Sequence, residues 1–516
     1  MLAKRATKLI RLETLVVLLA GLALGLVVFL GENRVVGFEP GYNELQPGHH
    51  GWVSSHTLAI ISHASWQNAF VGYALAIVDE YGQVDFDYFD RTPVFFSAGM
   101  HTLLSFWPRL STKVYLAKQA MNGIFLLTLL AAFGLIRTLT GRNLVSVAVP
   151  ILAASSRYLL FYKDMVHYDQ PALLGTVVLM FGIAQYAIHG RRWLVYATAL
   201  FAVSLGGHAF AALAVLGVWF ALEVIRELSS RTSEGSGVLR RIASLVSLRV
   251  LSVSVVWAAL NFLYNVFVEA NKRGVSLTET SIVQSAFNRL ALNPTFNESY
   301  QRLLDWDYFL SDQVVRAVRW IFPVWNYEAP LGLSVLLVIC VVTAIVLYGR
   351  SLDPSRRLVL TIMAVSGPAW LFVMRNLSAF HDYTAMLYLG MGLAFYTALL
   401  SLRRIPRGAW ILIIALSVAL FGERNLSTQA WHVAIGRPLN VYTYDFMRIA
   451  ESLPGPGQAV LYQDGVPYAP YAAGFYLPDQ LIAPPEHAQF TITRDSGFAD
   501  VTLTPANDRL FLFRAP

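Results

Sequence analysis

Residues 14–30 read TLVVLLAGLALGLVVFL, an apolar run without a charged side chain. Basic residues precede it, at Lys4, Arg5, Lys8 and Arg11. A helix crosses a bilayer with about 20 mostly apolar residues, and basic residues mark its cytoplasmic end. The run therefore predicts a membrane span with a cytoplasmic N-terminus. A signal peptide is the alternative, but Val35-Val36-Gly37 is a poor cleavage site, so we expect the span to be retained.

The pattern recurs along the whole chain, which is 56% hydrophobic and only 14% charged. Soluble proteins have about 25% charged residues. We predict an all-α polytopic membrane protein with about eleven transmembrane helices. Their cores are residues 14–30, 114–136, 144–162, 170–188, 193–206, 209–225, 250–268, 331–348, 357–374, 385–402 and 409–422. The net charge of +7 lies largely in short loops on the N-terminal side, so it indicates membrane topology and does not point to nucleic acid.

Three polar parts are predicted on the other, extracytoplasmic side. The first outer loop, 31–113, contains two amphipathic stretches, 57–78 and 94–107, that we expect to be interfacial helices. A second long outer loop covers residues 269–330. Residues 1–422 would thus form the transmembrane domain and residues 423–516 a small soluble α+β domain. Strands are expected in this tail at 457–464, 489–493 and 509–513.

The first outer loop opens with a dense group of ionisable residues, Glu39, Glu44, His49 and His50. A carboxylate in partly apolar surroundings can serve as a general base. The other interpretation is a hydrated loop whose acids face water. The histidines lack a compact ligand motif such as HExxH. We therefore assign no metal or cofactor, although a divalent ion is conceivable, and expect the histidines to bind a polar substrate.

Two further groups lie at the outer ends of spans. One contains Arg157, Lys163, Asp164 and Asp169, and the other contains Arg375, His381, Asp382 and Tyr383. Ionisable residues at such positions are costly and usually functional. Arginine suits phosphate oxygens, so Arg375, together with Lys163, is a candidate phosphate ligand. Snorkelling of Arg157 to the interface and a surface pair of Lys163 with Asp164 are the simpler alternatives.

The chain resembles the GT-C superfamily of polytopic glycosyltransferases, in particular the protein-mannosyltransferase and aminoarabinose-transferase branch. The likeness covers the layout of residues 1–420. It rests on Asn43-Glu44 after the first span, the segment 90–96 (Asp-Arg-Thr-Pro-Val-Phe-Phe), Ser156-Arg157-Tyr158, and His381-Asp382-Tyr383. Asn43 replaces the first acid of the paired Asp-Glu usual in the family, which leaves Glu44 as the counterpart and Glu39 as its rival.

The resemblance implies an inverting transfer of a sugar from a polyprenyl-phosphate carrier to a lipid, glycan or protein acceptor on the outer face. Glu44 would be the general base, and Arg157 and Arg375 would lie near the phosphate. The substrate-binding residues would be Glu39, His49, His50, Asp164, Asp169, His381, Asp382 and Tyr383. The chain would be an integral protein of a bacterial inner or plasma membrane, with its C-terminal domain on the extracytoplasmic side.

Two other classes compete with this assignment. A transporter or flippase would carry related halves and midplane ionisable groups, and the sequence shows neither. A scaffold that only presents its tail domain would not need polar groups gathered on one side of the membrane. Whether a substrate is covalently changed or only moved distinguishes the enzyme from the transporter.

Overall fold

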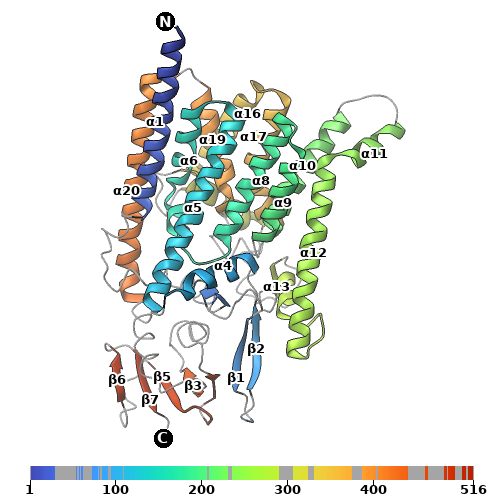
Figure 1. The fold of residues 1–516 in the computed structure, drawn as a ribbon. Helices are drawn as coiled ribbons and strands as arrows, with labels where there is room; N and C mark the ends of the chain where they lie inside the picture. Colours follow the sequence, from blue (N-terminus) through green and yellow to red (C-terminus); the bar gives the residue numbers. More distant parts are fainter. Residues whose placement is uncertain are drawn as a thin grey trace.

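The computed structural model describes most of the membrane bundle and parts of the first loop and tail. The described residues are 2–29, 54, 57–58, 60–61, 73–78, 81, 84–90, 94–107, 110–205, 209–229, 235–289, 306–322, 330–374, 386–402, 405–439, 459–462, 481–484, 486–493, 502–506 and 510–514. The chain folds as a bundle of long helices with a sheet at the end opposite the N-terminus (Figure 1). We call that end the sheet side.

Every predicted span corresponds to a helix of the bundle. These helices are α1 (Leu2–Phe29), α5 (Leu110–Thr140), α6 (Asn143–Ala154), α8 (Asp169–His189), α9 (Arg192–Leu205), α10 (Ala209–Ser229), α12 (Val246–Arg273), α16 (Leu331–Arg350), α17 (Pro354–Val373), α19 (Leu389–Ser401) and α20 (Arg407–Leu439). Six helices in the described part are long and apolar enough to cross a membrane. The total of about eleven spans stays a prediction.

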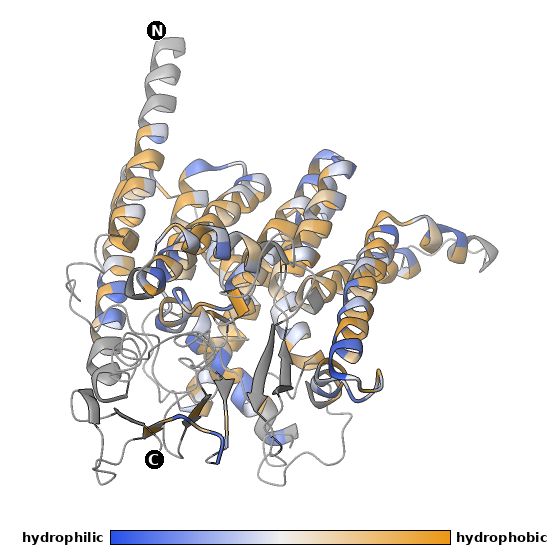
Figure 2. Ribbon diagram, turned by 60° about the horizontal axis from the view of Figure 1, so that its bottom comes forward, coloured by the Kyte–Doolittle hydropathy of each residue, from blue (hydrophilic) through white to orange (hydrophobic). Residues whose placement is uncertain are grey.

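Apolar side chains on the outside of the bundle show what surrounds it. Leu336 and Ile339 of α16 are each 55% exposed, and Leu263 of α12 is 61% exposed. Hydrophobic residues cover most of the helix lengths in Figure 2. Contiguous exposed apolar surface of this extent suits lipid and not water. The chain is therefore an integral membrane protein.

Glycines let neighbouring helices approach closely. A Cβ at Gly175 of α8 would lie 2.9 Å from Cα of Ala202 in α9. A Cβ at Gly367 of α17 would lie 2.7 Å from the carbonyl oxygen of Leu387, just before α19. Small residues at helix contacts provide the van der Waals packing that drives association in lipid. The first contact packs α8 against α9, and α8 begins beside the candidate site.

The short helices fill the connections. They are α4 (Val94–Ser105), α7 (Arg157–Tyr162), α11 (Gly235–Ser244), α13 (Ser281–Arg289) and α15 (Trp306–Ile321). α4 falls within the predicted interfacial helix 94–107, and α13 and α15 occupy the second long outer loop. The predicted continuous span 144–162 is wrong, because the helix breaks at Ser155 and Ser156 between α6 and α7.

A seven-stranded sheet joins the first loop to the tail. Its strand order is β2-β1-β4-β3-β5-β7-β6. The strands are β1 (Tyr73–Val78), β2 (Val84–Asp90), β3 (Ala459–Tyr462), β4 (Leu481–Ile482), β5 (Phe490–Thr493), β6 (Thr502–Ala506) and β7 (Leu510–Arg514). The first loop enters this sheet through β1, which pairs in parallel with β4 at Ile77 and Ile482. The predicted strands of the tail coincide with β3, β5 and β7.

Two expectations for these regions need adjustment. Residues 73–78 were predicted as the end of an interfacial helix and instead form β1, because a short apolar run also suits a strand paired on both edges. At the predicted domain boundary, α20 continues unbroken from residue 422 into residue 423 and ends at Leu439. The division into a bundle and a separate tail domain stays a prediction.

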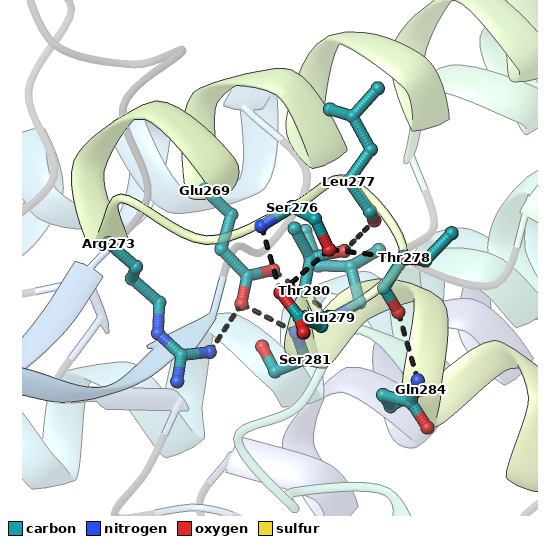
Figure 3. Close-up of polar contacts among 10 residues, drawn as sticks. Glu269, Arg273, Ser276, Leu277, Thr278, Glu279, Thr280, Ser281 and Gln284 are labelled. Carbon is teal, nitrogen blue, oxygen red and sulfur yellow. Dashed lines mark hydrogen bonds and ion pairs between the residues drawn. The ribbon is translucent and has the colours of Figure 1, made fainter.

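A carboxylate holds the end of α12 against the start of α13 (Figure 3). Glu269 is fully buried and accepts backbone hydrogen bonds from Ser281 N at 2.6 Å and Ile282 N at 3.2 Å. It also accepts from Arg273 Nη1 at 2.9 Å. The free N–H groups and positive dipole end of a helix favour an anion there. Glu269 thus fixes the entry to the second long outer loop.

Candidate functional site

The candidate site is built around the connection from α6 to α8. Ser156 is the N-cap of α7, because its Oγ accepts a hydrogen bond from Leu159 N at 3.5 Å. The same hydroxyl donates to the carbonyl of Arg319 in α15 at 2.9 Å. Serine commonly caps helices in this way. Ser156 therefore starts the new helix and ties it to the second long outer loop.

Aromatic packing fixes α7 against α15. The rings of Tyr162 and Trp320 are stacked, with centroids 5.8 Å apart, and Tyr158 contacts the same indole at 5.8 Å. The Arg319 guanidinium lies 5.8 Å from the centroid of the Tyr158 ring, within the range of a cation–π interaction. The residues that follow Tyr162 consequently leave α7 at a defined position.

Two lysines, an asparagine and an aspartate meet directly after α7. Lys163 Nζ donates to Oδ1 of Asn122 in α5 at 3.0 Å. One turn away on α5, Lys118 Nζ lies 3.5 Å from Oδ2 of Asp164. Lys118 is 7% exposed, and the other three are fully buried. We call these four residues the lysine cluster. Two ammonium groups beside one carboxylate give the cluster a net positive charge when both lysines are protonated, which favours an anion next to it.

Burial has a chemical consequence for Lys163. The residue lies in the loop between α7 and α8. Loss of water lowers the pKa of its ammonium group to about 8, and the neighbouring Asp164 carboxylate opposes that shift. Lys163 therefore loses part of its charge near physiological pH, and an anion beside it would favour the charged form.

The start of α8 carries a second polar group. His167 Nδ1 lies 2.6 Å from Asp169 Oδ2, and both residues are buried. Gln170 is fully buried and donates from Nε2 to the Tyr162 carbonyl at 3.0 Å. The bond from Gln170 joins the first turn of α8 to the last residue of α7. The six-residue loop 163–168 is thus held at both ends.

The structure places three of the predicted site residues. Arg157 is the first residue of α7 and is partly buried, Asp164 belongs to the lysine cluster, and Asp169 is the first residue of α8. Asp164 therefore lies in the short loop before α8, and Asp169 directly follows that loop. The other predicted residues lie outside the described part of the chain, namely Glu39, Glu44, His49, His50, Arg375, His381, Asp382 and Tyr383. Their roles stay predictions.

Sequence reasoning missed the contribution of α5. Lys118 and Asn122 were read as part of an apolar span, although they are four residues apart and lie on one face of a helix. The turns that follow them in α5 are almost entirely apolar. A polar pair at helical spacing confined to one end of a span would have been the signal.

No protein family and no curated protein matches the sequence. Solved structures do match. ArnT from Cupriavidus metallidurans bound to undecaprenyl phosphate covers 98% of this chain and 98% of its own, with a TM-score of 0.56 and 12% identity. The apo state of ArnT gives a TM-score of 0.53 and 11% identity over the same shares.

An archaeal enzyme is similar as well. The Archaeoglobus fulgidus oligosaccharyltransferase, tethered to an acceptor peptide containing the NVT sequon, covers 92% of this chain and 64% of its own, with a TM-score of 0.50 and 13% identity. This enzyme and ArnT are both GT-C glycosyltransferases. Over nearly its whole length, the chain shares the fold of these two proteins, which is the kind of fold that the resemblance in its sequence predicted.

Proposed function

We propose that the chain is a membrane glycosyltransferase that takes a sugar from a polyprenyl-phosphate carrier and transfers it, with inversion, to an acceptor on the extracytoplasmic face. The lysine cluster is the observation that carries this proposal. A polyprenyl chain keeps the donor in the bilayer and leaves its phosphate at the membrane surface. The buried ammonium groups of Lys118 and Lys163 suit that phosphate. The undecaprenyl phosphate bound to ArnT supports a donor of this class.

The reaction assigns a role to each group. Glu44 removes the proton from the acceptor hydroxyl as its oxygen attacks the anomeric carbon. The bond from that carbon to the phosphate oxygen breaks, and the electron pair leaves on the phosphate. Attack opposite the leaving group inverts the anomer. Lys118, Lys163, Arg157 and Arg375 offset the charge that develops on the phosphate.

The remaining residues position the substrates. Asp164, in the loop before α8, and Asp169, the first residue of α8, orient the sugar or acceptor. The rest of the substrate site is lined by Glu39, His49, His50, His381, Asp382 and Tyr383. The basic loops support a cytoplasmic N-terminus, which places the candidate site and the tail outside. The acceptor is a lipid, glycan or protein.

The decisive experiment compares Glu44→Gln with Lys163→Met in purified, lipid-reconstituted protein. Mass spectrometry of lipid-linked sugars that accumulate in a deletion strain first names the donor. Glu44→Gln is expected to abolish transfer and to bind undecaprenyl phosphate normally, because only the base is lost. Lys163→Met is expected to weaken that binding. Glu279→Gln is the control, because Glu279 is an exposed carboxylate in the second outer loop.

Three results would reject the proposal or one of its assignments. Undiminished transfer by Glu44→Gln removes the assigned base, and movement of an unmodified substrate across the bilayer indicates a transporter. Unchanged binding of undecaprenyl phosphate in both Lys118→Met and Lys163→Met removes the phosphate site.

A further inference from the structure

Helix α20 carries a group of buried side chains, each with one polar atom that is unpaired in the described part of the structure. Asn425, Thr428 and Gln429 of α20 are 0%, 3% and 3% exposed. Asn425 Oδ1, Thr428 Oγ1 and Gln429 Nε2 have no hydrogen-bond partner in the described part of the structure. A spacing of three and four residues places all three on one face of the helix. We call them the α20 stripe.

Such a group needs an explanation, because buried polar atoms in folded proteins are almost always hydrogen-bonded. The cost of an unpaired group is highest inside a membrane bundle. Elsewhere on α20 a buried hydroxyl is satisfied locally, since Ser417 Oγ donates to the Ile413 carbonyl at 2.7 Å. Thr428 does not do so. The α20 stripe therefore has free hydrogen-bonding capacity that a ligand can use.

The depth of the α20 stripe follows from an aromatic contact between α5 and α20. The rings of Phe125 and Phe421 stack with centroids 6.4 Å apart. The helices run in opposite directions, because the Arg142 guanidinium after α5 lies 5.5 Å from the ring of Trp410 at the start of α20. From the stacked rings toward the sheet side, residue numbers decrease along α5 and increase along α20.

The α20 stripe and the lysine cluster lie at the same depth. At about 1.5 Å per residue, Asn122 and Lys118 lie about 4 and 10 Å beyond the stacked rings on α5. Asn425 and Thr428 lie about 6 and 10 Å beyond them on α20. α7, which leads directly into Lys163, packs against α20. Asn425 Nδ2 also lies 3.4 Å from the Val27 carbonyl, next to the sheet-side end of α1.

We propose that the α20 stripe is a sugar-binding wall of the transferase site. An amide oxygen, a hydroxyl and an amide nitrogen provide an acceptor, a group that both donates and accepts, and a donor. This set complements the hydroxyl groups of a sugar and offers no charge to a phosphate. The lysine cluster binds the phosphate, and the α20 stripe hydrogen-bonds the sugar carried by it. This inference rests on the proposed function and assigns its sugar subsite.

The test replaces the polar groups by apolar ones of similar size, in Asn425→Leu, Thr428→Val and Gln429→Met. The probes are undecaprenyl phosphate and the same lipid carrying glucose, mannose or aminoarabinose. For the sugar lipid that wild type binds most tightly, each variant is expected to lose about tenfold in affinity, the value of one hydrogen bond. Binding of the bare carrier should not change. Ser417→Ala is the matched control and should bind all probes like wild type.

Thermal unfolding separates this role from a structural one. Thr428→Val and Gln429→Met should unfold at the wild-type temperature or higher, because they remove unsatisfied polar atoms. Asn425→Leu also removes the bond to the Val27 carbonyl, so it is left out of this comparison. A lower unfolding temperature together with unchanged preference for the sugar lipid overturns the proposal. So does an equal loss of affinity for the bare and the loaded carrier, or a wild type that binds no sugar lipid more tightly than the bare one. A wild type that does not bind undecaprenyl phosphate at all defeats the proposed function itself.

Discussion

Binding of a polyprenyl phosphate should weaken as the pH rises through the pKa of Lys163. Burial lowers that pKa to about 8, and only the ammonium form attracts the phosphate. About nine tenths of the lysine is charged at pH 7 and about one tenth at pH 9. The dissociation constant should therefore rise about tenfold over this interval. The phosphate does not contribute, because its second pKa is about 6 and it remains a dianion.

As the pH rises, the contribution of Lys163 to the free energy of unfolding increases while lipid binding weakens. The two effects can therefore be told apart. The pKa of Lys163 is lowered from 10.5 by folding, so the unfolded chain binds more protons between pH 8 and 10.5. The free energy of unfolding contributed by this group is lowest below pH 8 and rises above it. Weaker binding at pH 9 cannot then come from destabilisation through Lys163.

The assay is equilibrium binding of labelled undecaprenyl phosphate to the protein in nanodiscs at pH 7, 8 and 9. Lys163→Arg serves as the second arm, because arginine keeps its charge throughout this range. Its dissociation constant should be nearly independent of pH. A flat profile in wild type, or an equally steep profile in Lys163→Arg, would refute the assignment of Lys163 to the phosphate.

Three further outcomes are expected. Glu269→Gln should lower the free energy of unfolding by about 1–3 kcal/mol, because charge-assisted hydrogen bonds are lost. Hydrogen exchange should accelerate in residues 281–289, and unchanged exchange would contradict the capping role of Glu269. Gly175→Val should lower the free energy of unfolding by about 1–3 kcal/mol, because the valine side chain would collide with the backbone of Ala202. Gly123→Ala should unfold like wild type in the same thermal assay, because Gly123 has open space around it. Removal of divalent ions with EDTA should leave transfer unchanged, because basic side chains offset the phosphate charge; loss of transfer restored by a divalent ion would show that this account is wrong.

The spans were predictable because lipid imposes simple rules on sequence. The first apolar run and the arginine-rich loops were sufficient to place every long helix near its observed position. The break before Ser156 was not predictable from hydropathy, because residues 144–162 are apolar enough throughout. It becomes visible only when the serine hydroxyl is seen to cap α7 and to bond Arg319. Local apolar content does not reveal such a distant partner.

The candidate site was predictable only in part. Asp164 and Asp169 were identified because they stand out at the ends of apolar runs. Lys118 was missed because its significance depends on its distance to Asp164, which the fold sets. The α20 stripe was missed for a different reason, since asparagine, threonine and glutamine are unremarkable where a span ends. What distinguishes them is that each is buried with one polar atom unpaired in the described part of the structure, a property that the sequence does not contain.

The pairing of β1 with β4 has a consequence for biogenesis. The hairpin of the first loop is synthesised long before its neighbour Ile482, because almost the whole helical bundle lies between them in the sequence. Contacts between residues so far apart in the sequence form slowly. Until β4 pairs with β1, the free edge of β1 exposes unpaired backbone N–H and C=O groups to other strands. The nascent protein must therefore pass through a state in which its first helices are already inserted in lipid while the hairpin still has an unpaired edge. Chains that stop before residue 459 would remain at that stage and be favoured targets for proteases.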